Sequence, residues 1–252
     1  MHILPQTDEG GVCAMWKKSV WVIVPVVLAV LLSLLANGGA VPADGGASIP
    51  AGEKYVALTF DDGPRCSTTE RLLDGLKERG VCATFFLIGQ QIESNASLVE
   101  RMASEGHQVG NHTWSHQRLE GIDAAAAAQE VERTEAVLED LLGGGEYWLR
   151  PPYGQVMDGL EDSFGVPMIK WSVDPRDWES RDAEKVSKAI LKDVKPNSII
   201  LLHDIYPTSV DAALKVVDTL QEEGYWFVTV EELLYLNGVT PEAGEMYRTG
   251  RG

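Results

Sequence analysis

The sequence has little cysteine, a shortage of positive charge and no internal repeat. Three cysteines in 252 residues are too few for a disulfide framework. Cys66 and Cys82 stand at the two ends of a predicted helix, roughly 18 Å apart, which is too far for a disulfide between them. With 21 basic against 38 acidic residues, the formal net charge is -17, and this argues against binding to nucleic acid or to an anionic surface.

Long apolar runs are also scarce, and only one suggests a membrane. Lys17 and Lys18 precede Val20–Ala36, which is short for a spanning helix and long for the core of a signal peptide. The length favours an uncleaved anchor, whereas Val41-Pro42-Ala43 resembles a cleavage site, so both alternatives stay open. In either case we expect the rest of the chain to be extracellular, secreted or membrane-anchored in the cell envelope, with the lysines left inside.

The length and an apolar content of 44% allow one substantial core. We expect residues 1–36 to be an N-terminal tail with a signal peptide or membrane anchor, and residues 37–53 to be a linker rich in Gly, Ala and Pro. Residues 54–238 are expected to form one catalytic domain, and residues 239–252 a frayed C-terminal tail. Met15 is a more natural start than Met1 for such a leader. We expect a monomer.

From Tyr55 onward, apolar runs alternate with helical patterns. The expected strands are Tyr55–Phe60, Ala83–Gly89, Gln108–Thr113, Glu146–Arg150, Met168–Asp174, Ser198–His203 and Trp226–Val230. The expected helices lie near Thr68–Arg79, Ile92–Glu105, Ala124–Leu142, Gly154–Phe164, Ala183–Val194 and Ser209–Glu223. This alternation predicts parallel strands joined by right-handed crossovers, and hence an α/β layered or barrel fold.

Residues capable of chemistry follow the ends of several of these strands. They are Asp61-Asp62, His112 and His116, Arg150, Asp174 and Asp177, and His203-Asp204. In a parallel barrel the carboxyl ends of the strands open on one face, where such folds carry their active sites. We therefore expect these groups to converge on one rim.

Asp61 and Asp62 end a predicted buried strand just before Gly63-Pro64, a turn signal. Adjacent residues on an extended backbone point in different directions, so one carboxylate can hold a cation while the other faces a reacting group. Alone, such a pair is more often two solvated acids in a loop. The other strand-end residues favour the functional interpretation.

His112 and His116 are four residues apart, a spacing that brings two imidazoles to one side of a helical turn. Taken alone, the pair is as often structural as functional. Together with Asp62 it predicts a two-histidine, one-carboxylate site for Zn²⁺ or another divalent first-row ion, with positions open for water and substrate.

The reaction class follows from such a site. A metal-held water has a lowered pKa, and Asp61 is placed to take its proton as the water attacks a carbonyl. Arg150 is placed to orient Asp61 and to keep it ionised. The alternative for Arg150 is an ordinary surface arginine.

Two more groups complete this chemistry. The stiff turn Pro151-Pro152-Tyr153-Gly154 can fix a backbone N–H that donates to the developing oxyanion. His203, which ends an apolar run, is placed to protonate a leaving group, with Asp177 raising its pKa. A histidine in this position is otherwise a satisfied core residue.

Five motifs in order resemble the polysaccharide deacetylase family, carbohydrate esterase family four. They are Thr59-Phe60-Asp61-Asp62-Gly63-Pro64, His112 to His116, Arg150-Pro151-Pro152-Tyr153-Gly154, Asp174-Pro175-Arg176-Asp177-Trp178 and Leu201-Leu202-His203-Asp204. The resemblance covers roughly residues 54–237. It implies a distorted TIM-like barrel of about seven parallel strands and a divalent metal, Zn²⁺ or Co²⁺.

The resemblance also implies a role for each motif residue. Asp61 is the base and His203 the acid, while Arg150 steadies the base, Asp177 partners the acid and the Tyr153 amide binds the oxyanion. The metal ligands are Asp62, His112 and His116, and the substrate side is lined by Trp178, Leu201, Pro151 and Asp174. Asp174 is the alternative to Asp177 as the partner of His203.

The implied activity is removal of N-acetyl groups from amino-sugar polymers. Export favours a cell-wall glycan, either peptidoglycan N-acetylglucosamine or a chitooligosaccharide, as substrate and partner. The membrane is a further partner if the N-terminal segment is uncleaved. O-deacetylation of acetylated xylan is the nearest alternative. A non-catalytic glycan-binding envelope protein is a second alternative, of a different class.

Overall fold

The structure, a computed structural model, describes residues 54–252. The expected leader and linker, including Val20–Ala36, lie outside the described residues, so their roles stay predictions. Among the helices of residues 54–252, none combines the length and the apolar character that crossing a membrane requires.

A five-stranded parallel sheet positions everything else. Strands β3 (Gln108–Asn111), β2 (Thr84–Leu87), β1 (Lys54–Asp61) and β5 (Ile199–His203) are neighbours in that order, and β6 (Tyr225–Phe227) also pairs with β1. Every residue of β1 after Lys54 is buried, which is typical of a parallel strand covered on both faces.

Isolated parallel bridges continue the pairing beyond the two edges of the sheet. Leu149 bridges Asn111 on one side and Met168 on the other, and Val173 bridges Ile200 in β5. Met168 belongs to the short strand β4 (Met168–Ile169). The pairing therefore runs from β3 round to β5 and closes a distorted barrel. The α/β class with parallel strands, predicted from the sequence, is confirmed.

The expected strand Glu146–Arg150 is reduced to the two isolated bridges of one residue, Leu149. Pro151 and Pro152 follow at once and lack N–H groups, so a ladder cannot continue past this point. In the neighbouring strand β3, residue 110 must be a glycine because the segment around Trp148 approaches it closely. A Cβ at Gly110 would lie only 2.8 Å from the carbonyl oxygen of Trp148.

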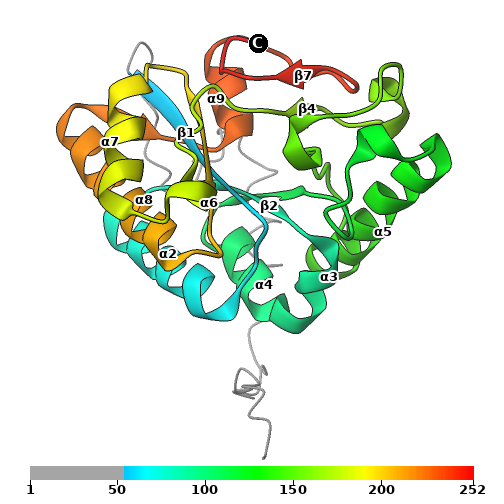
Figure 1. Cartoon of the computed structure of the whole chain (residues 1–252), viewed down its shortest axis with the longest axis horizontal. Coiled ribbons are helices and arrows are strands. Elements are labelled where there is room, and N and C mark those ends of the chain that lie inside the picture. Colours follow the sequence, from blue (N-terminus) through cyan, green and yellow to red (C-terminus); the bar gives the residue numbers. More distant parts are fainter. Residues whose placement is uncertain (1–53) are drawn as a thin grey trace, which may run out of the picture. The chain divides into compact units, whose positions relative to one another are not determined.

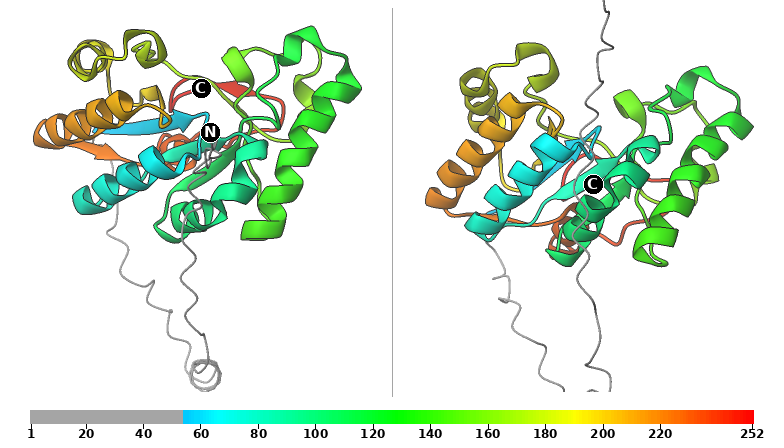
Figure 2. Two further views of the ribbon diagram at one scale, coloured as in Figure 1. Left: turned by 60° about the horizontal axis from the view of Figure 1, so that its bottom comes forward. Right: turned by 90° about the horizontal axis from the view of Figure 1, so that it is seen from below.

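Helices lie around the strands (Figure 1). They are α2 (Cys66–Arg79), α3 (Gly89–Ile92), α4 (Ala96–Ser104), α5 (Ala124–Leu142), α6 (Asp177–Ser180), α7 (Ala183–Asp193), α8 (Pro207–Glu222) and α9 (Val230–Leu236). Helix α8 packs against both α2 and α7 (Figure 2). The largest cluster of buried apolar side chains joins these helices to the sheet, with Leu72, Val216 and Phe60 among its members.

Further segments differ from the sequence-based expectation. The helix expected over Gly154–Phe164 is wrong: two 3₁₀ turns, Pro152–Gly154 and Glu161–Phe164, stand at its ends. Gly159 between them has φ of 86°, a left-handed conformation that no helix contains. The segment 239–252 is not frayed, since it carries β7 (Met246–Tyr247), which pairs with β4.

Candidate active site

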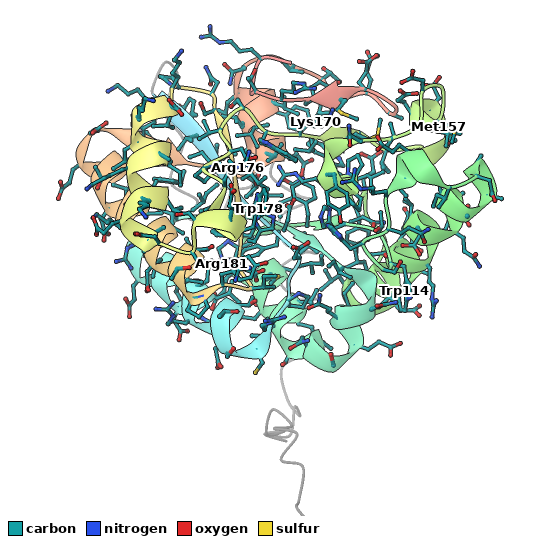
Figure 3. All side chains as sticks on the ribbon, viewed as in Figure 1. Trp114, Met157, Lys170, Arg176, Trp178 and Arg181 are labelled. Carbon is teal, nitrogen blue, oxygen red and sulfur yellow. The ribbon has the colours of Figure 1, made fainter. Side chains whose placement is uncertain are left out.

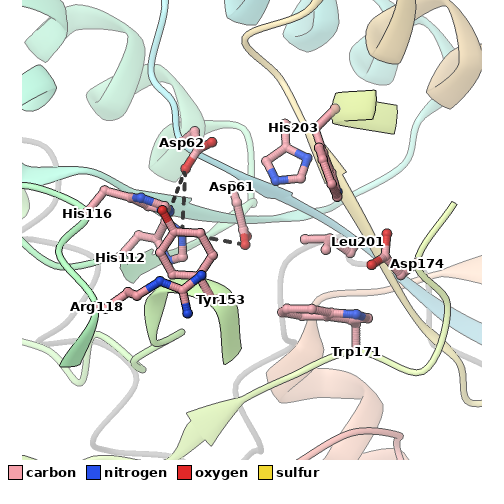
Figure 4. A pocket seen from close by; sticks show the side chains of 11 residues that line it. Asp61, Asp62, His112, His116, Arg118, Tyr153, Trp171, Asp174, Leu201 and His203 are labelled. Atoms are coloured by element: carbon pink, nitrogen blue, oxygen red, sulfur yellow. Dashed lines mark ion pairs between the residues drawn. The ribbon is translucent and has the colours of Figure 1, made fainter. Parts of the chain in front are cut away.

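The carboxyl ends of β1, β3 and β5 open into one cavity of about 470 Å³ (Figure 4). Its lining residues come from all five motifs and from two positions outside them: Asp61, Asp62, His112, His116, Arg118, Tyr153, Trp171, Asp174, Trp178, Leu201 and His203. Parallel pairing explains the convergence, because β1 pairs with β2 and β5, and β2 with β3, all in the same direction.

Asp62, His112 and His116 form a cluster that suits a metal ion. One ligand atom from each lies within 4.8 Å of the others. Oδ1 of Asp62 is 3.3 Å from Nε2 of His116 and 3.6 Å from Nε2 of His112. This oxygen is buried, and within residues 54–252 it accepts no hydrogen bond. A buried carboxylate oxygen without a donor is costly unless a cation compensates it.

The protonation of His112 also suits a metal. Its Nδ1 lies 2.6 Å from the carbonyl oxygen of Arg150. A carbonyl oxygen only accepts, so Nδ1 carries the proton and Nε2 presents its lone pair to the cluster. One carboxylate oxygen and two imidazole nitrogens are a donor set that Zn²⁺ and Co²⁺ accept.

The segment 112–116, called the ligand loop below, is not the helical turn that its spacing predicts. Thr113 and His116 have φ of 67° and 62°, both in the left-handed region. The two imidazole rings nevertheless lie 4.9 Å apart. The turn geometry, rather than a helix, brings them to one side.

Helix α5 and the end of β3 hold the ligand loop in this conformation. The backbone N–H and hydroxyl of Ser115 both donate to the carboxylate of Glu130, at 2.8 and 2.9 Å. Oδ1 of Asn111 accepts from the Thr113 N–H at 2.8 Å, while its amide donates to the Val131 carbonyl at 2.9 Å.

Asp61 lies beside the cluster and is held by Arg150. The fully buried Arg150 donates from Nη1 to Oδ1 of Asp61 and to Oγ1 of Thr59, both at 2.7 Å. Burial acts to raise the pKa of Asp61, but the opposing interactions, of which the positive charge of Arg150 is the largest, outweigh it and lower the pKa below its usual value. Asp61 is therefore ionised and fixed in orientation.

His203 is held from behind by Asp177. Its Nδ1 donates to Oδ1 of Asp177 at 2.8 Å, and its backbone N–H donates to Oδ2 at 2.9 Å. The hydroxyl of Ser209 donates to the same Oδ2 at 2.5 Å. Burial lowers the pKa of His203, but the hydrogen bond and charge of Asp177, with Asp61 and Asp62, raise the pKa to about 9.

Asp174, the alternative partner, contacts neither of these groups by a hydrogen bond. Its Oδ1 accepts from the Arg176 N–H at 2.9 Å, and its side chain lines the cavity.

The walls of the cavity are largely apolar. Leu201 is buried, and Trp178 is 42% exposed at the opening. The ring of Tyr153 meets that of His116 edge to face at 5.0 Å. Pro151 is buried and is absent from the lining residues described for this cavity; its carbonyl accepts from the Gly154 N–H at 2.8 Å.

Asp204 lies behind the site and not in it. Its side chain is fully buried and accepts from the Thr69 hydroxyl. Burial, followed by the charge of Asp62, raises its pKa to about 7. Gly63 packs against its carboxylate so closely that a Cβ would collide with it. Asp204 thus supports the turn that carries Asp62.

Sequence reasoning missed three residues of the site. Trp171 lies inside the expected strand Met168–Asp174, which the structure ends at Ile169, so its place after a strand was not visible. Arg118 stands two residues after His116, which was a usable signal. Ser209, in α8, reaches Asp177 from 32 positions away along the chain, and no local pattern points to it.

The chain is similar to proteins of described activity. A model of the family described as polysaccharide deacetylase matches residues 48–164. The chain is 40% identical over 180 residues to the peptidoglycan-N-acetylglucosamine deacetylase PgdA of Listeria monocytogenes, a match that covers 71% of this chain and 39% of that protein. It therefore spans about two fifths of the length of this curated relative.

Two solved structures share the fold. The peptidoglycan deacetylase PdaC from Bacillus subtilis superposes with a TM-score of 0.74 at 36% identity, over 75% of this chain and 94% of that one. A family 4 acetyl xylan esterase from Clostridium thermocellum, in complex with a cobalt ion, superposes with a TM-score of 0.73 at 34% identity, over 78% of this chain and 98% of that one.

Proposed function

The chain belongs to the polysaccharide deacetylase family, and from this premise we propose that it is a metal-dependent hydrolase that removes N-acetyl groups from amino-sugar polymers. The observation that carries the proposal is the three-ligand cluster of Asp62, His112 and His116, flanked by an ionised carboxylate and a protonated imidazole. In metal-assisted amide hydrolysis the metal activates the water, the carboxylate takes its proton and the imidazolium protonates the leaving nitrogen.

Asp62, His112 and His116 would hold the metal, which we propose is Zn²⁺ or Co²⁺ in the cell. A divalent ion there would lower the pKa of water and polarise the carbonyl of the acetyl group. Asp62 offers a buried oxygen without a donor, and His112 offers an unprotonated Nε2. The cobalt ion bound by the structurally related esterase supports the choice of metal.

Asp61 is the proposed general base. Its lowered pKa keeps it ionised, and Arg150 aims it by a 2.7 Å hydrogen bond at Oδ1. Oδ2 is 3.7 Å from Nε2 of His112, so this oxygen faces the metal cluster. Asp61 is thus placed to accept the proton of an attacking water.

His203 is the proposed general acid. A pKa of about 9 keeps its ring protonated at neutral pH, and Nδ1 is engaged by Asp177. The proton on Nε2 is therefore the one available to the nitrogen that leaves as an amine. An amide needs this proton because an unprotonated amine anion is a very poor leaving group.

The remaining residues bind and orient. We assign the backbone N–H of Tyr153 as a hydrogen-bond donor to the developing oxyanion. The turn after Pro151 is stiff, and the carbonyl oxygen of Pro151 accepts from the Gly154 N–H. Trp178 and Leu201 supply an apolar wall for the acetyl methyl group, because binding a methyl group requires only an apolar surface of matching shape. Asp174 lines the opening, where it is placed to accept from sugar hydroxyls. For Pro151 we keep only a role in the turn.

Peptidoglycan is the proposed substrate, because the two peptidoglycan deacetylases are similar over most of the described residues. This substrate lies outside the membrane, in agreement with the export expected from Val20–Ala36. Whether that segment is cleaved or retained as an anchor stays open. O-deacetylation of xylan is a second candidate, favoured by the similarity to an acetyl xylan esterase.

Acetate release tests the proposal. The purified full-length protein, supplied with Zn²⁺ or Co²⁺, should release acetate from peptidoglycan fragments and chitooligosaccharides, and chelation should abolish this until metal is returned. Asp61→Asn should lower kcat by a factor on the order of 10²–10⁴, because one general base is lost, while the metal stays bound. Acetate from acetylated xylan alone would favour the esterase. No acetate from any of them would leave the non-catalytic alternative.

A further inference from the structure

Arg118 is a charged residue of the cavity that no step above uses. Among the lining residues that belong to the described part of the chain, it alone has a permanent positive charge. Figure 4 shows it below Tyr153, on the same side of the cavity as His112 and His116 and opposite Trp171 and Asp174.

The guanidinium of Arg118 lies over an aromatic ring. Its Cζ lies 3.8 Å from the ring centroid of Tyr153, and that ring in turn contacts His116. Stacking uses the face of a guanidinium and leaves its N–H groups, which point outward in the plane, free to meet a ligand. The cation is therefore fixed next to the metal cluster with its donating edge exposed.

Internal contacts leave most of these N–H groups unused. Nη1 lies 3.3 Å from Oε1 of Gln155 and 3.5 Å from Oε1 of Glu120. Charge-assisted hydrogen bonds are normally about 2.7–2.9 Å long, so both contacts are weak. Considering residues 54–252 alone, Nε and Nη2 donate to no acceptor. The side chain is 52% exposed, so a ligand can reach it.

Four other arginines of this acidic chain are paired more tightly than Arg118. Arg71, Arg79, Arg101 and Arg176 each have a carboxylate oxygen at 2.6 or 2.7 Å. Arg176 is the closest comparison, because it also lies over an aromatic residue of the cavity, Trp178 (Figure 3). Glu179 compensates the charge of Arg176 at 2.6 Å, whereas the carboxylate of Glu120 lies 3.5 Å from Arg118.

We propose that Arg118 binds a carboxylate of the substrate glycan and gives the site a preference for acidic amino-sugar polymers. The inference rests on the proposed function and names the substrate chemistry of the same site. A guanidinium and a carboxylate pair through two parallel N–H···O bonds. In peptidoglycan this carboxylate comes either from the lactyl ether of a muramic acid sugar without a stem peptide or from the stem peptide itself, and chitooligosaccharides have neither.

Binding measurements with three glycans separate these sources. They are an oligomer of N-acetylglucosamine and N-acetylmuramic acid without peptide, the same oligomer with its stem peptide, and a neutral chitooligosaccharide of equal length. Dissociation constants are measured by calorimetry on the metal-loaded full-length protein carrying Asp61→Asn, so that turnover does not interfere. Adding Arg118→Gln should weaken binding of an acidic oligomer about tenfold relative to the neutral one, the loss expected from one charged hydrogen-bonded pair.

The pattern of the loss identifies the carboxylate. Attachment of the stem peptide converts the lactyl carboxylate into an amide, so a loss only with the peptide-free oligomer assigns the bound group to the lactyl carboxylate. A loss only with the peptide-bearing oligomer assigns it to the peptide, and a loss with both shows that Arg118 pairs with either carboxylate. Arg118→Lys keeps the positive charge but loses the paired N–H donors of the guanidinium, so it should retain part of the preference for acidic over neutral glycans. Arg176→Gln is the matched control and should leave the ratio of the dissociation constants unchanged.

An equal effect of Arg118→Gln on acidic and neutral glycans, or no effect on either, would overturn the inference. Failure of the proposed function has a different signature. In that case the protein with native Asp61 releases no acetate from any of the three glycans, while the ratio of dissociation constants still reports on Arg118.

Discussion

His203 owes its protonation at neutral pH mainly to one neighbour. Burial alone would lower the pKa of this imidazole, and the charge and hydrogen bond of Asp177 reverse that effect and raise the pKa to about 9. Ser209 and the His203 backbone N–H fix the other oxygen of Asp177. The acid form of His203 therefore exists below about pH 9 and is lost as the pH rises through that value.

The fall of activity at alkaline pH should reveal the effect of Asp177 on the pKa of His203. Asp177→Asn removes the charge that raises the pKa of His203, so the alkaline limb of kcat/KM should move from about pH 9 toward the ordinary imidazole value of 6.5. Measurement of kcat/KM against pH for both proteins checks this. Asp174→Asn is the control and should leave the position of the limb unchanged. A limb that stays near pH 9 in Asp177→Asn would show that Asp177 does not tune His203.

For single residues, the sequence predicted the site wherever a side chain capable of chemistry stands at or just after the end of a strand. Asp61, Asp62 and His203 follow that rule, and all three line the cavity. Ser209 and Thr59 do not follow it, because their contacts with Asp177 and Arg150 arise only when distant segments fold together.

Helix α5 acts as the support for the ligand loop. Two bonds from Ser115 to Glu130 and one from Asn111 to Val131 join the loop and β3 to this helix. The loop contains two residues with positive φ, a conformation that costs energy for residues other than glycine. It is therefore expected to relax if α5 releases it.

Removing this support should weaken metal binding. Glu130→Ala deletes both acceptors of Ser115, and loss of outer contacts of this kind typically lowers metal affinity about 10–100-fold. Titration of Zn²⁺ into the metal-free protein, followed by calorimetry, measures the change without reference to activity. Glu132→Ala alters an exposed glutamate of the same helix and should have no effect. Equal affinities for the Glu130→Ala and unaltered proteins would refute the supporting role of α5.

Elements were predictable where residue pattern and backbone agree. The buried run that ends at Asp61 and the alanine-rich α5 have one dominant signal each. Gly154–Phe164 has a helical pattern of apolar residues, but Gly159 prevents the helix. The spacing of His112 and His116 fits a helix equally well, and only the left-handed residues Thr113 and His116 exclude one.

The barrel as a whole brings together groups from four separate strand ends. Asp61 ends β1 and Asp62 follows it, His112 and His116 follow β3, Arg150 follows the bridges at Leu149, and His203 ends β5. Continuous ladders join β3, β2, β1 and β5, whereas isolated bridges close the remaining side. The proposed chemistry thus depends on closure of the barrel, since Arg150 lies on the bridged side and Asp61 on the laddered side.

The central claim is that Asp62, His112 and His116 hold a single divalent ion between Asp61 and His203. An anomalous difference map at the zinc edge, from crystals of the Zn²⁺-loaded protein, tests it most directly. We predict one peak in the cavity, about 2.0–2.2 Å from Oδ1 of Asp62 and from Nε2 of each histidine. A peak bound by other residues, or no peak in the cavity at saturating Zn²⁺, would contradict the account.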